Sequence, residues 1–248
     1  MSSLAELERA ATALCMGGEP TAAQLAELGD AKIWALYREM IQQRLRGELK
    51  VALRRSCDAL GDAALGRVFE AWLRDAPPRS RPFHGIVEDF ARFAAGVVRA
   101  DTALPAWTAD LIAYESALWA VGDMDDRASD GVVDLSFDAP PCFTPARRLI
   151  ALAHAVHELP LPDGSYKKAD VALCVYRRPD DKAARSFVLN PTMHALLAAL
   201  DAGELTLTQA VQRVAKERKL RVDQAFIDGL CTVLADFSER GLLLGSKG

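Results

Sequence analysis

The sequence predicts an α+β protein that is mainly α: an N-terminal helical bundle followed by a winged-helix-like module, a β-hairpin plus three helices. Three observations lead to this fold class. Apolar residues recur at helical spacing through residues 1–122. Acidic residues, Ser and Gly replace these stripes at residues 122–131, as at a domain boundary. Strand-like runs and three capped helical segments follow. We therefore expect two domains, residues 1–125 and residues 131–248.

The N-terminal domain is expected to contain helices and no strands. One apolar stripe begins with Ile33, Tyr37 and Met40 and continues to Leu53, and further stripes lie before and after the sequence "APPRSRP" at residues 76–82. Three prolines in seven residues exclude a helix there and predict a rigid connection. A compact bundle of helices is the expected outcome.

Four strand-like runs follow the boundary. They are "VVDLSF" from Val132, "RRLIALAHAVHEL" from Arg147, "DVALCVYRR" from Asp170 and "SFVLN" from Ser186. The second run also suits a helix, but Pro145 and Pro160 bracket it, which favours a strand. The sequence "RRPDDKAAR" between the third and fourth runs is typical of a hairpin loop.

Three helices are expected after these strands. Asn190 suits the N-cap of the first, and Pro191 suits its first turn. Thr206 and Gln209 have the spacing of a capping box at the start of the second. The third begins near Asp223 and ends before "LLLG", which suits a short strand.

Composition argues against several functional classes. The net charge is -4 and acidic and basic residues are interspersed, whereas nucleic-acid-binding proteins usually carry a basic face. No apolar run approaches the roughly 20 residues that span a bilayer, and the N-terminus lacks the pattern of an export signal. The five cysteines are far apart and odd in number, as in a cytoplasmic protein with reduced thiols. We therefore expect a cytoplasmic protein without a membrane partner.

The histidines and acidic residues predict no catalytic residue and no metal ligand. His84 and Glu88 share one face of a helix, but two ligands are too few for a metal site. His154 and His157 point to opposite faces if their segment is a strand, and to one face only if it is a helix. The acidic run at residues 123–126 lacks the glycine and glutamate of a calcium loop. An enzyme that uses these histidines remains the alternative.

DNA binding is a second alternative, in the form of a winged-helix transcriptional regulator. The sequence "KERKLRVD" from Lys216 is basic and lies where helix-turn-helix proteins approach DNA. The next helix, however, carries four carboxylates that would repel phosphate: Asp223, Asp228, Asp236 and Glu239. We therefore expect no nucleic-acid partner.

The N-terminal part resembles the HvfC/BufC family. The resemblance is carried by "WALYREMIQQRLRGEL", "LGRVFEAWLRDAPPRSRPFHGIVEDFARF" and "LPAWTADLIAYESALW". The recurring family features match Tyr37 with Arg38, Leu65 with Gly66, Pro77 to Arg81, Asp89 with Phe90 and Phe93, and Asp110 with Leu111 and Glu115. Asp89 departs from the pattern, because Glu is expected there. In this family the N-terminal part is catalogued as a DNA-binding domain.

The C-terminal part is similar to PqqD-like recognition elements for RiPPs, the ribosomally made peptides that enzymes modify after translation. "SFVLNPTMHALLAAL" resembles their strand-to-helix junction, and "FIDGLCTVLADFSERGLLLG" resembles their last helix. The two resemblances together cover most of the chain.

The resemblance implies a non-catalytic accessory subunit of the MbnC and TglI type. Such proteins pair with a TIM-barrel enzyme that has a multinuclear non-haem iron centre and modifies cysteine or nearby residues of a ribosomal precursor peptide. The iron is then expected in the partner enzyme, and no cofactor is expected in this chain.

The expected binding site is an exposed edge of the hairpin beside a helix. Unpaired backbone groups at such an edge pair with an extended peptide as an added strand. We expect the leader of the precursor peptide to bind there, lined by Val175, Tyr176, Phe187, Val188, Phe226 and Leu230. The sequence leaves open which edge is free, and whether the module instead only packs against the N-terminal bundle.

Overall fold

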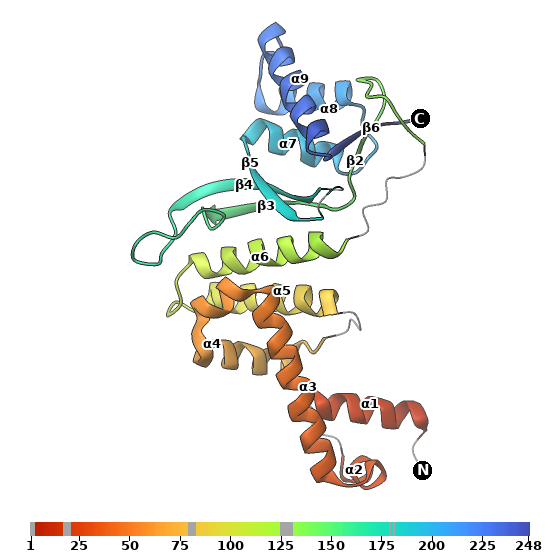
Figure 1. Ribbon diagram of the computed structural model, residues 1–248, viewed down its shortest axis with the longest axis vertical. Coiled ribbons are helices and arrows are strands. Elements are labelled where there is room, and N and C mark those ends of the chain that lie inside the picture. The colour runs from red at the N-terminus through yellow and green to blue at the C-terminus, as the bar shows by residue number, and fades with distance from the viewer. Residues whose placement is uncertain (1–2, 17–20, 79–82, 125–130, 179, 181) are drawn as a thin grey trace. The chain divides into compact units, whose positions relative to one another are not determined.

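A computed structural model describes residues 3–16, 21–78, 83–124, 131–178, 180 and 182–248 (Figure 1). The chain divides into two compact units, Met1–Ser116 and Ala117–Gly248, so that the division lies inside the helix α6 (Trp107–Asp123). Part of the predicted linker at residues 122–131 and part of the predicted proline turn at residues 76–82 lie outside the described residues. The protein is mainly helical with two small antiparallel sheets, which confirms the predicted fold class.

The described part of the first unit is helical throughout. Its elements are α1 (Leu4–Cys15), α2 (Ala22–Leu28), α3 (Ala31–Ala52), α4 (Arg54–Asp75), α5 (Phe83–Ala100) and the first part of α6. Capping boxes formed by Ser3 with Glu6 and by Thr21 with Gln24 start the first two helices. Gly61 has φ 68° and marks a kink within α4, a backbone conformation that favours glycine.

Aromatic residues form the centre of the first unit. The ring of Trp72 meets that of Phe90 edge-on with centroids 5.2 Å apart, and it lies 5.8 Å from the ring of Phe69. Glu115 of α6 accepts hydrogen bonds from the backbone N–H groups of Arg55 and Ser56, at 3.0 and 2.8 Å. Glu115 thus caps the start of α4, where the N-cap residue makes no side-chain hydrogen bond.

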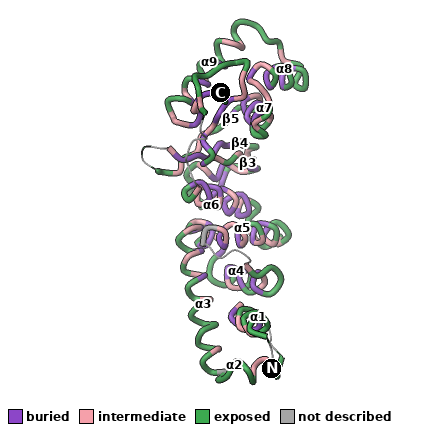
Figure 2. The backbone as a smooth tube through the Cα atoms, turned by 90° about the vertical axis from the view of Figure 1, so that its right-hand side faces the viewer, coloured by how far each residue is buried: buried purple, intermediate pink, exposed green. Residues whose placement is uncertain are grey.

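The predicted stripe along α3 does not form one continuous buried face. Leu49 and Leu53 are buried, but Ile33, Tyr37 and Met40 are each more than half exposed (Figure 2). Successive residues on a helix are rotated by about 100°, so the two groups lie on different sides of α3. The early part of the stripe therefore leaves an apolar helix face on the surface, which the spacing alone did not distinguish from core.

The second unit contains a three-stranded antiparallel sheet in the order β3 (Arg147–His154), β4 (Lys168–Arg177) and β5 (Ala184–Leu189). The strands confirm three of the predicted strand runs, including the one that also suited a helix. The predicted hairpin is therefore extended by β3 to a three-stranded meander, with β4 in the centre and the other two strands at the edges.

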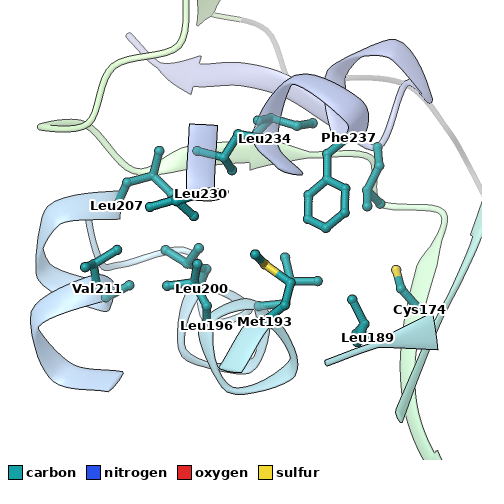
Figure 3. Close-up of a cluster of buried hydrophobic side chains, with 14 of the residues drawn as sticks. Cys174, Leu189, Met193, Leu196, Leu200, Leu207, Val211, Leu230, Leu234 and Phe237 are labelled. Carbon is teal, nitrogen blue, oxygen red and sulfur yellow. The ribbon is translucent and has the colours of Figure 1, made fainter. Parts of the chain in front are cut away.

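Three helices pack on one face of this sheet: α7 (Pro191–Leu200), α8 (Leu207–Arg218) and α9 (Gln224–Glu239). The predicted caps are present: Asn190 accepts from the N–H of Met193, and Thr206 and Gln209 form a capping box. Residues from all three helices and from β4 and β5 meet in one apolar core (Figure 3). The larger members of this core include Tyr176, Leu196, Leu200, Leu207, Leu230, Leu234 and Phe237.

A second small sheet contacts α9. Strand β6 (Leu243–Lys247) pairs with β1 (Val132–Val133) and with β2 (Pro141–Phe143). The predicted strand from Val132 is shorter than expected, and β2 was not predicted because its three residues carry no periodic pattern. Gly245 has φ 146°, and a Cβ there would lie 2.2 Å from the carbonyl oxygen of Val133. Only glycine fits at that position.

Candidate functional site

At the outer edge of β5, the backbone of Val188 faces away from the sheet. The N–H of Arg177 bonds to the carbonyl of Ala146 at 3.0 Å, so the backbone of Arg177 faces β3. The backbone N–H and C=O groups of successive residues point to opposite sides of a strand. The backbone groups of Cys174 and Tyr176 therefore face β5. Cys174 lies opposite Phe187. It follows that the N–H and C=O of Val188, the next residue, point away from β4.

Val188 also presents its side chain to the surface. Side chains alternate between the two faces of a strand, and Val188 points away from the helices, with 57% of its surface exposed. The neighbouring residues Phe187 and Leu189 point toward the helices and contact the apolar core. Both the backbone and the side chain of Val188 are thus accessible to another chain.

The helix α9 forms a wall beside this edge. The ring of Phe187 lies 5.3 Å from that of Phe237 on α9 and 5.6 Å from that of Tyr176 on β4. Along the same helix, Phe226 and Val233 are partly buried and pack against the core. Aromatic contacts of this kind fix the distance between strand and helix, and they leave an apolar surface beside the open backbone.

Arg240, just after α9, joins the helix to the sheet. Its guanidinium lies 5.5 Å from the ring centre of Phe187 and 2.7 Å from a carboxylate oxygen of Asp236. Hydrogen bonds to Asp236, and then to the hydroxyl of Tyr176, raise the pKa of Arg240. The charge therefore stays on Arg240 at any physiological pH, and the hydroxyl of the buried Tyr176 has a partner.

A cavity of about 530 Å³ lies between the start of α7 and the first half of α9. Its apolar lining comes from Met193, Leu196, Leu220, Phe226, Leu230 and Val233. Arg221 is the charged residue in its lining. We call this cavity the α7–α9 pocket. It is large enough for a bulky side chain of a ligand, within the range of small-molecule sites.

The six residues predicted to line the peptide site occupy three environments. Val175 and Tyr176 lie on the central strand β4 and are fully buried, with exposed fractions of 0% and 1%. Leu230 is also buried in the core, although it reaches the α7–α9 pocket. A peptide at the β5 edge would not touch Val175 or Tyr176 in this structure.

The other three predicted residues reach the surface. Phe187 and Phe226 are partly buried, Phe187 on the edge strand itself and Phe226 in the α7–α9 pocket, while Val188 is exposed. The structure therefore brings together the β5 edge, the wall of α9 and the pocket at its N-terminal half. Arg221, Arg240, Met193 and Val233 also belong to this region. Sequence reasoning did not single out any of these four as a site residue.

The histidine candidates do not assemble into a larger site. His154 ends β3, and His157 follows in the loop with its Nε2 3.8 Å from a carboxylate oxygen of Glu158. The structure does not describe the side chain of His84. In the described part of the chain, no three His, Cys, Asp or Glu residues come close enough together to hold a metal ion. Within the same part, no helix has the length and apolar character needed to cross a bilayer.

Four of the five cysteines are buried, and Cys231 on α9 is exposed. Burial raises the pKa of the Cys174 thiol to about 12 and that of Cys57 to about 12, the latter with a further contribution from the carboxylate of Glu115. Burial also raises the pKa of Cys15. These three thiols are therefore protonated and poorly nucleophilic near neutral pH.

Comparison with known protein families matches residues 145–238 to the HvfC C-terminal domain. The match begins before β3 and ends at the last turn of α9, so it contains the sheet, the three helices and the α7–α9 pocket. No curated protein matches the chain at the level of significance required.

Proposed function

We propose that this HvfC-like chain, whose residues 145–238 match the HvfC C-terminal domain, binds the leader of a ribosomally made precursor peptide for a partner enzyme. Membership of this family suggests an accessory protein in a RiPP-type system rather than a catalyst. In the proposed function, the leader adds to the outer edge of β5 as an extra strand, and the peptide's core is presented to an enzyme in the cytoplasm.

One observation carries this proposal: the open backbone of Val188 lies at a sheet edge and has the apolar wall of α9 beside it. Strand addition uses unpaired N–H and C=O groups for affinity and nearby pockets for side-chain selection. The β5 edge supplies the first, and the surface formed by Phe187 and α9 supplies the second.

The partner proposed for this chain is a TIM-barrel enzyme with a multinuclear non-haem iron centre. Holding the leader on an accessory subunit raises the effective concentration of the peptide core at the partner's active site. It also restricts how the core approaches that site. The residues of this chain would therefore act by binding and orienting, while iron chemistry at a cysteine of the core would belong to the partner.

The test combines co-expression with a backbone substitution. The full chain is expressed with the enzyme and the precursor peptide encoded beside it, and we expect the three to purify as one complex. Binding of the fluorescein-labelled leader to the full chain is then measured by fluorescence anisotropy. Val188→Pro removes the outward N–H of the edge strand without removing a ladder hydrogen bond, a position where proline is tolerated.

We expect Val188→Pro to weaken leader binding at least ten-fold, while the matched control Val188→Thr, which keeps both the N–H and the β-branched shape, binds like the natural chain. Equal binding by both variants would exclude strand addition at β5. Failure of both the enzyme and the leader to bind the natural chain would reject the proposed function as a whole.

A further inference from the structure

The α7–α9 pocket is apolar inside and electropositive at its rim. Arg221 is part of the lining, and Lys219 and Leu220 precede it in the loop between α8 and α9. The first turns of both α7 and α9 also contribute to the lining, through residues 191–193 and 225–226. Helix N-termini carry a partial positive charge, which adds to the charge of the arginine.

The basic residues of this loop are not neutralised within the chain. Lys219 and Arg221 belong to the loop, and Lys216 and Arg218 precede it in the last turn of α8; all four are exposed. None of them forms a salt bridge with a carboxylate among the residues that the structure describes. The nearby carboxylates are already engaged: Glu217 pairs with Arg213 at 3.0 Å, and Asp223 accepts from the N–H of Phe226 at 3.1 Å. The chain as a whole has a net charge of -4, yet this short segment is basic and places Arg221 in the lining of the pocket.

We propose that the α7–α9 pocket binds one bulky apolar side chain of an acidic peptide segment, whose carboxylates lie against Arg221 and the neighbouring cations. The apolar lining would contact the bulky side chain of the peptide, and the basic rim would attract its carboxylates. This inference rests on the proposed function, because the segment would be part of the leader. It adds a composition to that leader: an apolar anchor residue with Asp or Glu beside it.

An acidic peptide fits this surface better than duplex DNA does. DNA presents phosphates and grooves, and it has no exposed apolar side chain to fill a cavity of about 530 Å³. The exposed face of α9 also carries Asp228 and Glu239, which would repel a phosphate backbone lying along the helix. A peptide needs to contact only the pocket and its basic rim.

Gly229 allows the pocket to be filled without strain. It lies in the middle of α9, lines the pocket, and a Cβ built on it meets no atom within 4 Å. Gly229→Leu should therefore occupy the pocket and even favour the helix, because leucine is a better helix former than glycine. Gly96→Leu is the matched control: Gly96 is an exposed glycine of α5 in the other unit, and its Cβ also meets nothing.

Arg221→Glu tests the charge of the rim. Arg67→Glu makes the same change in net charge on the exposed surface of α4 and serves as its control. The probe is a synthetic fluorescein-labelled peptide with a single Phe among Asp and Glu residues. A second probe carries Ala in place of Phe, and a third carries Asn and Gln in place of the acidic residues. Binding to the full chain is measured by anisotropy at two salt concentrations.

We expect the acidic Phe probe to bind and the Ala probe to bind about ten-fold to one-hundred-fold more weakly, as the burial of one large apolar side chain implies. Gly229→Leu should cause a similar loss. Arg221→Glu and the neutral probe should each bind about ten-fold more weakly and with less dependence on salt. Both control variants should bind like the natural chain.

Three results would overturn the inference. The first is equal binding of the acidic Phe probe by Gly229→Leu and the natural chain, which includes the case of no binding to either. The second is equal binding of the acidic and neutral probes. The third is tighter binding of duplex DNA than of the probe, with that DNA binding lost in Arg221→Glu.

If leader binding is lost in Val188→Pro but not in Gly229→Leu, the proposed function stands and only the pocket's role is rejected.

Discussion

The neighbouring strands β4 and β5 have similar sequences but opposite roles. Both contain aromatic and β-branched residues, as in "CVY" at residues 174–176 and "FVL" at residues 187–189. On β4, Val175 and Tyr176 are buried on opposite faces of the sheet and the strand pairs on both sides. On β5, Val188 is 57% exposed and the strand pairs on one side only.

The difference shows that position in the sheet, rather than residue type, decides whether a strand can bind another chain. From Leu173 to Arg177 the central strand has no exposed side chain, and it pairs on both sides, so its aromatic residue contributes to stability. The edge strand pairs on one side only and keeps Val188 exposed. Substitutions and chemical modification that affect stability should therefore act most strongly on the interior of β4. Their effects should be smallest at Arg240, which links α9 to β5.

The largest effect is expected in the chemical reactivity of cysteines. Cys174 on β4 is fully buried, whereas Cys231 on α9 is exposed. Cys174 can react only when the unit opens, and opening of a stable core costs about 5–15 kcal/mol. We therefore expect a thiol reagent at pH 8 to modify Cys231 at least a thousand-fold faster than Cys174, as measured by mass spectrometry of peptides over time.

Cys231→Ser is the control and should remove the fast phase. Comparable rates at the two sites would contradict the burial of β4.

Stability should also depend on pH, because the Cys174 thiol has a pKa of about 12 when folded and 9.0 as its ordinary value. The stabilisation is therefore complete below about pH 9 and is lost as the pH rises from there toward 12, because the unfolded chain releases its proton first.

The next largest effect is expected for Tyr176→Ala on the central strand. The substitution removes a fully buried ring and leaves a cavity, so the free energy of unfolding should fall by about 3–5 kcal/mol, as for other large aromatic residues. Val188→Ala is the matched substitution on the edge strand and should change it by less than about 0.5 kcal/mol. Native-state hydrogen exchange of the β4 amides measures the stability of this unit separately from the other. Similar losses for both variants would show that β5 is not an open edge.

Much of the fold of the second unit could be predicted because local signals agree with it. Asn190 and Thr206 cap the helices where the sequence indicated, and the strand from Arg147 forms despite its alanine-rich sequence. The first unit was harder. Ile33 and Met40 have the spacing of core residues, but only the packing of the neighbouring helices determines which side of α3 is covered.

The candidate site could be predicted in part only. An open edge is a property of strand order, which depends on contacts between distant segments, and for that reason Val175 was grouped with Val188. The α7–α9 pocket has the same origin, because it joins residues about 30 positions apart in sequence such as Met193 and Phe226. Arg221 lies in the basic segment that indicated possible DNA contact. Its position beside an apolar pocket becomes visible only in the folded chain.

The smallest effect concerns Arg240, which links α9 to β5. Arg240→Gln removes the ion pair with Asp236, the contact with the ring of Phe187 and the hydrogen bond to Tyr176. The side chain is 42% exposed, so solvent weakens the ion pair, and we expect a loss of about 1 kcal/mol in the free energy of unfolding. Arg213→Gln is a close control, since Arg213 also pairs with a carboxylate four residues away, at 3.0 Å.

That control should lose less than about 0.5 kcal/mol, as is usual for an exposed pair on a helix. The difference in the free energy of unfolding between the two variants gives the contribution of the contacts with Phe187 and Tyr176. It is measured by urea unfolding and by hydrogen exchange of the β5 amides. If Arg240→Gln is no more damaging than Arg213→Gln, then α9 is held beside the edge strand by the ring contacts of Phe187 and Phe237 alone. In that case the position of the peptide site depends on the apolar core and not on the contacts of Arg240.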